Sequence, residues 1–477
     1  MHRYLLSTFL LTSLGLWAAD APPREPLRLT LRRAVEIATS PEGNTYIQLS
    51  GENIRQAKSR TEEARSAFLP DLEAHASQTV AMKSLAALGL DLATNETLLD
   101  AEQSLSTSCK GIGCSIVPEE QALLNDIIKD IPRVVGPFNS VDVRVTAAQS
   151  VFDFGSIRRY QASRAALRAV KQDSNNTNDT VSTTVAKAYL AALRSNADVE
   201  AYEANVALAE AVLKQSENQK AAGTGTGIEV TRSKVQLAYE KQHLLAVKND
   251  RNKAYLNLLR AMGMNLGTEL ELTDKLSYEP TDSISVEQAQ AEALKNRPDL
   301  KAQAEREEAA HLNAQSVRYE RMPSLIAFAD YGTTGTNGSI VSLLPTRDYG
   351  VQLRVPIFDG GRRDARRAEA FSQFRQERIR ANDIHEQIEL DIRTALDTLH
   401  NAEEQLKVAE EGLTLADSEL TQSRRRYAAG VSTSLEVTNA QTQLEQARDN
   451  RISALFGYNV ARVDLGHAMG NVRSMIQ

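Results

Sequence analysis

One phrase occurs twice in this chain, far apart but in the same register of a larger repeat. "AAGTGTGIEV" occupies 221–230, and "AAGVSTSLEV" occupies 428–437, which is 207 residues later. At the same offset "AMG" at 261–263 recurs at 468–470. At an offset of 206, "VFDFG" upstream of the first phrase resembles "IFDGG" upstream of the second. Chance similarity between alanine-rich helices does not explain several matches in one order. The chain is therefore predicted to be two copies of a unit of about 200 residues.

Each copy contains a long stretch that is typical of helix. Residues 156–222 lack Pro and Gly, and 363–429 contain only Gly412. A helix of about 67 residues would extend about 100 Å. A second helical stretch follows the repeated phrase in each copy, at 228–262 and 435–469. The repeated phrase is thus predicted to be the tip of a helical hairpin.

The returning helices repeat apolar or small residues every seven positions. Gly223 and Gly430, just past the preceding helix ends, suit the left-handed backbone position that closes a helix. The clearest seam of small residues is Ala440, Ala447, Ala454, Ala461 and Ala468. This period predicts close, left-handed coiled-coil packing. An amphipathic globular helix is the alternative, but a helix of about 100 Å cannot pack along its whole length against a compact domain.

Two segments alternate apolar and polar residues, which is typical of strands with one apolar face. They span about 139–152 and 348–358, and each follows another candidate strand, at about 69–80 and 324–332. Paired strands of this kind indicate a membrane β-barrel; a soluble hairpin packed on one face is the alternative. Four strands cannot close a barrel, so chains must pool them. Two chains would give eight strands and a filled interior, whereas three would give twelve and room for a channel.

The N-terminal residues predict export from the cytoplasm. Residues 1–21 combine a basic start, an apolar run and small residues, as a signal peptide does; an N-terminal membrane anchor is the alternative. In an exported chain Cys109 and Cys114 are expected to form a disulfide. They lie in a long insertion, 81–138, expected to be extracellular. A net charge of −7 gives no reason to expect a nucleic-acid partner.

Enzyme signatures are weak. "HEQIE" at 385–389 lacks the second histidine of a zinc-protease motif, and "GTGTG" lacks the preceding strand of a nucleotide-binding loop. We therefore expect no catalytic residue, no metal site and no cofactor. A periplasmic coiled-coil adaptor or structural protein is the remaining alternative, although an adaptor would need one hairpin and a separate β-rich domain.

With these elements in order, the chain resembles the TolC-like outer membrane factors of Gram-negative efflux and type I secretion systems. The resemblance rests on the doubled strand-strand-helix-helix unit, the "FDFG" and "IFDGG" turns, "ALKNRPDL", and "RYAAGVSTSLEVTNAQTQL" at the second tip. The domain boundaries that we assign are a signal peptide 1–21, a first repeat 22–265 with its hairpin at 156–262, a connecting equatorial segment 266–282, and a second repeat 283–477 with its hairpin at 363–469.

The resemblance implies a mixed α and β membrane protein. It would be a homotrimer with a 12-stranded outer-membrane β-barrel in lipid, continuing into a long periplasmic α-helical coiled-coil barrel. Its function would be passive conduction to the exterior, with gating at the helical tips. Its partners would be a periplasmic adaptor (membrane fusion) protein and an inner-membrane pump of the RND or ABC type.

The resemblance also suggests roles at the tips. Glu229 and Glu436 would form an acidic pore entrance, which attracts cations; exposed helix-start residues favoured by the helix dipole are the alternative. The second acidic position of the family pattern is Asn439 in copy two and Arg232 in copy one, and Arg232 could pair with Glu229. The residues expected to dock the adaptor are Gly223, Arg426, Tyr427, Gly430 and Leu435. Arg426 could instead be an ordinary cation at a helix C-terminus.

Overall fold

The computed structural model describes residues 26–84, 134–280, 284–336 and 344–475. The predicted signal peptide, the Cys109–Cys114 disulfide and most of the 81–138 insertion lie outside these residues. The chain divides into two compact units, and each takes residues from both repeats. The sheet unit comprises 59–164 and 309–374, and the hairpin unit comprises 1–58, 165–308 and 375–477.

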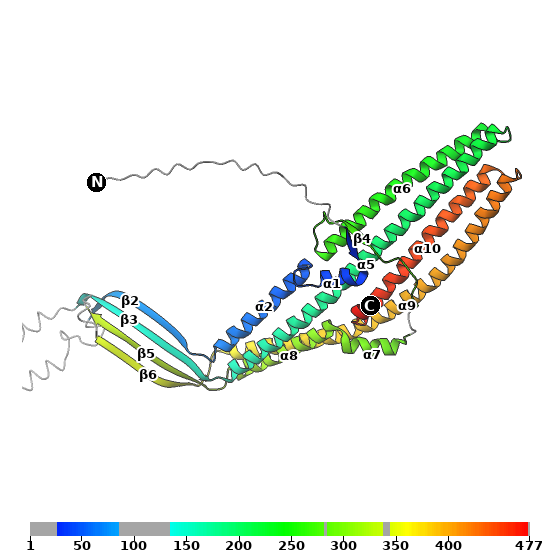
Figure 1. Ribbon diagram of the computed structural model, residues 1–477. Helices are drawn as coiled ribbons and strands as arrows, with labels where there is room; N and C mark the ends of the chain where they lie inside the picture. Colours follow the sequence, from blue (N-terminus) through cyan, green and yellow to red (C-terminus); the bar gives the residue numbers. More distant parts are fainter. Residues whose placement is uncertain (1–25, 85–133, 281–283, 337–343, 476–477) are drawn as a thin grey trace, which may run out of the picture. The chain divides into compact units, whose positions relative to one another are not determined.

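A four-stranded antiparallel sheet dominates the sheet unit (Figure 1). Its strands are β2 (Asp71–Ser84), β3 (Val134–Phe152), β5 (Ser324–Thr336) and β6 (Leu344–Arg354), in the order β2-β3-β5-β6. The pairing of β3 with β5 joins the strand pair of one repeat to that of the other. Among the strands that the structure describes, β2 and β6 each keep one edge without a partner strand.

The two faces of this sheet differ in chemistry, as the alternation predicts. On one face large apolar side chains are exposed, among them Leu72 at 70%, Tyr349 at 81% and Val351 at 65%. The opposite face carries charged groups, and the guanidinium of Arg144 lies 3.0 Å from a carboxylate oxygen of Asp142. In water an exposed apolar face of this size is a liability, so its presence marks a surface made for another apolar medium or a partner.

Four long helices form two antiparallel hairpins (Figure 1). They are α5 (Phe154–Ala221) with α6 (Gly227–Met262), and α9 (Arg362–Ala428) with α10 (Ser434–Ala468). Among the helices that the structure describes, none has the length and low polarity needed to cross a membrane.

The seven-residue seams are buried where the hairpins pack. On α10 the buried seam residues include Val437, Ala440, Leu444, Tyr458, Ala461 and Leu465. The seam of α6 is less apolar, because Ser233 and Glu240 are buried there at 5% and 4% exposure. The two repeats therefore use one packing pattern with different polarity.

The remaining described elements are shorter. They are β1 (Leu27–Leu29), α1 (Leu31–Ala38), α2 (Thr45–Ser66), β4 (Leu270–Leu272), α7 (Val286–Asn296), α8 (Pro298–Tyr319) and α11 (Val472–Met475). β1 pairs in parallel with β4, which lies in the predicted connecting segment. The buried Tyr189 supports this pairing, because its hydroxyl lies 2.9 Å from both the Leu29 carbonyl oxygen and an Asp274 carboxylate oxygen.

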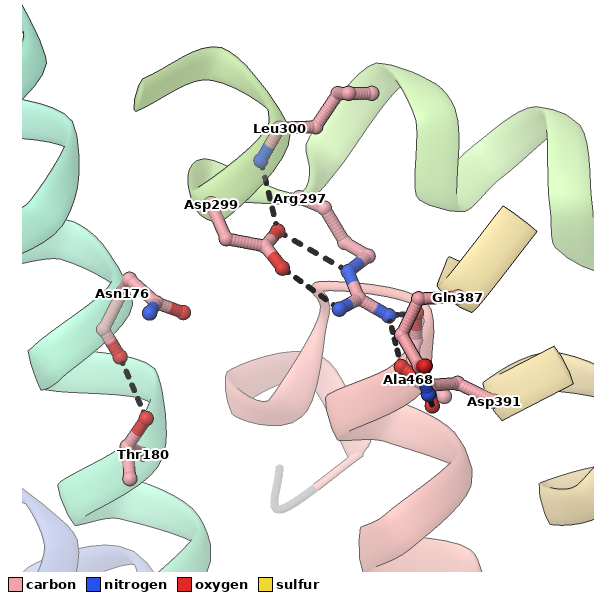
Figure 2. Close-up of polar contacts among 8 residues, drawn as sticks. All are labelled: Asn176, Thr180, Arg297, Asp299, Leu300, Gln387, Asp391 and Ala468. Atoms are coloured by element: carbon pink, nitrogen blue, oxygen red, sulfur yellow. Dashed lines mark hydrogen bonds and ion pairs between the residues drawn. The ribbon is translucent and has the colours of Figure 1, made fainter. Parts of the chain in front are cut away.

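The "NRPDL" motif makes a buried charged contact that joins three helices (Figure 2). The guanidinium of Arg297 lies 2.7 Å from carboxylate oxygens of both Asp299, at the start of α8, and Asp391 on α9. It also donates to the carbonyl oxygen of Ala468, the last residue of α10, at 3.5 Å. Burial alone would raise the pKa of Asp299, but the hydrogen bonds and charge of Arg297 outweigh it and lower that pKa.

The first repeat contains a neutral version of the same junction. There Asn44 donates its side-chain amide to the carbonyl oxygen of Ala261 at 2.6 Å, as Arg297 does to that of Ala468. The following glycines, Gly263 and Gly470, have φ of 75° and 67°. The duplication therefore extends to the contact at the end of each returning helix. The side chain that makes this contact is neutral in the first repeat and charged in the second.

Candidate functional site

The hairpin tips contain the residues that the sequence singles out, and their turns explain the repeated phrase. Gly223 and Gly430 have φ of 74° and 75°. The residue after each glycine donates its backbone N–H to the carbonyl five positions back, at 3.0 Å from Thr224 and 3.1 Å from Val431. This is the Schellman arrangement, which satisfies helix-end carbonyls and needs a left-handed residue. The glycine in "AAG" is thus required by the turn.

Both predicted entrance carboxylates lie in the first turn of a returning helix. The carboxylate of Glu229 accepts the backbone N–H of Thr226 at 3.1 Å. The carboxylate of Glu436 accepts the hydroxyl of Ser432 at 2.6 Å and lies 3.3 Å from the guanidinium of Arg426. Each also benefits from the positive end of the helix dipole. Arg426 is therefore the direct counter-charge of Glu436, a contact that sequence reasoning missed.

Arg232 does not pair with Glu229, so that expectation is wrong. Its guanidinium instead donates to the hydroxyl of Ser434 at 3.1 Å, across to the other hairpin. Ser434 is 1% exposed and begins α10. The long side chain of Arg232 reaches from one hairpin to the other. The equivalent residue of the second repeat, Asn439, has a shorter side chain and is exposed. Nothing in the local sequence pattern marks Ser434, because it lies 202 residues away from Arg232.

Tyr427 is only 3% exposed and fills the interior between the hairpins. Its hydroxyl lies 3.4 Å from that of Ser216, which in turn lies 3.0 Å from that of Ser233. Its carbonyl oxygen accepts the side-chain amide of Gln219 at 3.4 Å. In this conformation Tyr427 therefore connects the two hairpins and does not contribute to the accessible surface of the tip.

The other predicted docking residues are exposed. Gly223 and Gly430 lie on the surface, Leu435 is 50% exposed, and the Arg426 side chain is 59% exposed. Two apolar residues that the sequence analysis did not select lie nearby and are also exposed, namely Ile228 at 67% and Val431 at 68%. An apolar residue directly after a helix-ending glycine is the signal that could have identified Val431.

Further along the hairpins, carboxylates from α10 are partly buried between helices. The hydroxyl of Tyr202 donates to a carboxylate oxygen of Asp449 at 3.3 Å. Burial, with the nearby charge of Glu240, raises the pKa of Glu445. Burial likewise raises the pKa of Asp449. The packing of the hairpins therefore contains carboxylates whose charged form is disfavoured.

Taken together, these features define a class of protein. A sheet with an exposed apolar face and two unpaired edges is suited to a membrane β-barrel built from several chains. Two long helical hairpins with buried seven-residue seams are suited to a coiled-coil assembly. The combination indicates an outer-membrane channel with a helical part.

The chain belongs to the outer membrane efflux protein family, whose model matches residues 136–264 and 290–471. It is 26% identical over 322 residues to the pyoverdine export outer membrane protein OpmQ of Pseudomonas aeruginosa, a match that covers 65% of each chain. It is 20% identical over 335 residues to the alkaline protease secretion protein AprF of the same species, covering 68% of each.

Solved structures show the same fold. The Campylobacter jejuni CmeC outer membrane channel superposes with a TM-score of 0.73 at 16% identity, covering 93% of this chain and 86% of that one. The protein is thus an efflux channel of the Gram-negative outer membrane with a periplasmic part, and its family consists of channels and not enzymes. This membership decides against the alternative of a periplasmic adaptor.

Proposed function

We propose that three copies of this chain pool their strands into a 12-stranded barrel in the outer membrane. The observation that carries this proposal is the four-stranded sheet. Within the described part of the chain, its edge strands β2 and β6 lack outer partners, and its apolar face is exposed. Unpaired edges are not tolerated in lipid, so β6 of one copy would pair with β2 of the next. Twelve strands can enclose a channel, whereas eight would leave an interior filled by side chains.

The entrance of this channel would lie at the hairpin tips. In a trimer Glu229 and Glu436 contribute six carboxylates, which favour cations. Arg426 lies 3.3 Å from Glu436 and offsets part of that charge. Conduction would be passive, since ATP or the proton gradient would act at an inner-membrane pump.

The contact between Arg232 and Ser434 would hold the tips in their closed arrangement. It is a charge-assisted hydrogen bond of 3.1 Å between the two hairpins, and it is partly buried. Such a bond contributes about 1.5 kcal/mol, so its loss would raise the ratio of open to closed entrances about tenfold. Docking of a partner that competes for Arg232 would open the entrance in the same way.

That partner would be a periplasmic adaptor that contacts the exposed tip residues Gly223, Arg426, Gly430 and Leu435. The adaptor would connect the channel to an RND or ABC pump. The names of the relatives refer to pyoverdine export and alkaline protease secretion. We infer that the substrate of this chain is likewise a molecule delivered by such a pump.

Planar-bilayer conductance of the purified protein tests this proposal. Wild-type protein should insert as a channel of low conductance, and Arg232→Ala should raise the open fraction about tenfold. Lys234→Ala is the matched control, because Lys234 lies on the same helix and contacts only Glu217, at 3.7 Å, among the salt bridges of the described residues. Equal conductance of all three proteins would reject the gate, and absence of any conductance would reject the channel.

A further inference from the structure

A hollow in the sheet unit is unusually rich in arginine. It lies where β3 turns into α5 and β6 turns into α9, at the "FDFG" and "IFDGG" turns. Its volume is about 240 Å³. We call it the arginine hollow; the charged residues that line it are Arg159, Arg354, Arg362, Arg363, Arg366, Asp153 and Glu320.

Two carboxylates around the hollow already accept hydrogen bonds from the starts of the two helices. Asp153 accepts the backbone N–H of Gly155 at 2.9 Å and the hydroxyl of Ser156 at 2.6 Å, and so begins α5. Asp359, which precedes the arginines of α9 in the chain, accepts the backbone N–H of Arg363 at 3.1 Å and so begins α9. These two carboxylates serve the helix starts that the repeated turns create.

Two of the five arginines have no counter-charge of their own. Glu320 lies 2.7 Å from Arg366, and Asp359 lies 3.4 Å from Arg363 and 4.0 Å from Arg362. Among the described residues, no hydrogen bond or ion pair is found for the guanidinium groups of Arg159 and Arg354. Five guanidinium groups therefore face three carboxylates, and the hollow has an excess of positive charge.

Helix stability does not explain this arrangement. Arg362, Arg363 and Arg366 lie within the first five residues of α9, and Arg159 lies in the second turn of α5. Cations at a helix N-terminus are opposed by the helix dipole, whereas anions are favoured there. Arginine side chains and a helix N-terminus together suit a bound anion with several oxygen atoms, such as a carboxylate or phosphate.

The strand register places Arg354 on the polar face of the sheet. Arg354 pairs with Ser324, and two residues further along Gln352 pairs with Ile326. The neighbours Leu353 and Val355 project from the opposite, apolar face, where they are 63% and 53% exposed. In the proposed barrel the apolar face contacts lipid, so Arg354 would face the path of the solute.

We propose that the arginine hollow is an anion-binding station for the solute that passes through the channel. This inference rests on the proposed function, and the trimer would present three such stations. The station would take a carboxylate or phosphate group of the solute, with Arg159 and Arg354 as its free donors. The same polar face also carries Asp330 and Asp348 directly opposite each other, so anions and cations would be favoured at different levels.

The test compares two double variants in planar bilayers of a neutral lipid, with inorganic pyrophosphate as the probe. Arg159→Gln with Arg354→Gln removes two charges and no recorded ion pair. Arg158→Gln with Arg367→Gln is the control, because these neighbours on α5 and α9 do not line the hollow. We expect the pyrophosphate concentration that halves the potassium chloride current to rise about 100-fold in the first variant only, since two charge-assisted donors are lost and each contributes about tenfold.

Three outcomes would overturn the proposal. Equal block of wild type and both variants would show that the hollow binds no passing anion. An equal rise in both variants would show a general effect of charge. If block were unchanged but the first variant lost stabilisation by phosphatidylglycerol, the hollow would be a lipid headgroup site. Calorimetric titration of detergent-solubilised protein with pyrophosphate repeats the comparison without conductance, so failure of the channel proposal remains distinguishable.

Discussion

The buried contact at Arg297 gives a quantitative test of how the hairpin unit is held together. In Arg297→Met the side chain keeps its approximate length but loses its charge, and Asp299 and Asp391 lose their common partner. The Arg297 side chain is 13% exposed, and those of its partners are 27% and 32% exposed. Removing one partner of a buried ion pair costs about 3–5 kcal/mol, because it leaves uncompensated charge. We expect about 3 kcal/mol here, since the carboxylates keep some contact with water.

Thermal unfolding in detergent, followed by circular dichroism at 222 nm, measures this effect. A loss of about 3 kcal/mol should lower Tm by about 5 °C, because a unit of about 300 residues has an unfolding entropy of about 0.6 kcal/mol/K. Arg28→Met is the control: its pair with Glu271 spans 3.2 Å, but its side chain is 78% exposed. An exposed pair contributes less than about 1 kcal/mol, so its Tm should change by less than about 2 °C.

The pH dependence follows from the lowered pKa of Asp299. A carboxyl group with a lowered folded-state pKa stabilises the protein above its unfolded pKa of about 3.9, and this stabilisation is lost as pH falls through the folded value. The difference between wild type and Arg297→Met should therefore be complete at pH 7 and shrink below about pH 4. A Tm loss in Arg297→Met no larger than in Arg28→Met would refute the reasoning.

Three further predictions concern charge and backbone. Replacing Glu229 and Glu436 with Ala should reduce cation preference in bilayer conductance, and an unchanged reversal potential would remove their entrance role. Glu445→Gln should raise Tm at pH 7 but not at about pH 4. Burial raises the pKa of Glu445. The stability contributed by the neutral form of this group is therefore present below the unfolded pKa and is lost as pH rises through the folded pKa. Gly470→Ala should lower Tm more than Gly430→Ala. Both have positive φ, which costs about 1–2 kcal/mol for alanine, but only at Gly470 would a Cβ meet backbone atoms, at 2.9 Å; equal Tm losses would contradict this.

The elements of this fold were predictable because their signals are local. A helix without Gly or Pro, a strict two-residue alternation and a seven-residue seam can each be recognised within a short window of sequence. The structure places α5 at Phe154–Ala221 and α9 at Arg362–Ala428, within two residues of the predicted starts and ends. The repeated glycines at the tips were equally readable, since one backbone conformation requires them.

The two compact units were not predictable in the same way, because each mixes both repeats. The sequence suggested a division near 266–282, whereas the sheet unit joins the strands of both copies through β3 and β5. Pairing between segments so far apart leaves no local pattern. The arginine hollow has the same origin, although the "RRDARR" start of α9 was visible as a run of charge.

The sequence by itself determined the duplication, the long hairpins, the two-faced strands and the glycines at the tips, since each follows from periodicity or from one residue's backbone preference. Only the tertiary structure decided which side chains meet. In the folded chain Arg232 contacts Ser434 and not Glu229, and Tyr427 is buried between the hairpins. Arg297 contacts both α9 and α10. The physical reason is distance along the chain: these contacts join segments about 100–200 residues apart, and their geometry exists only after the helices have packed.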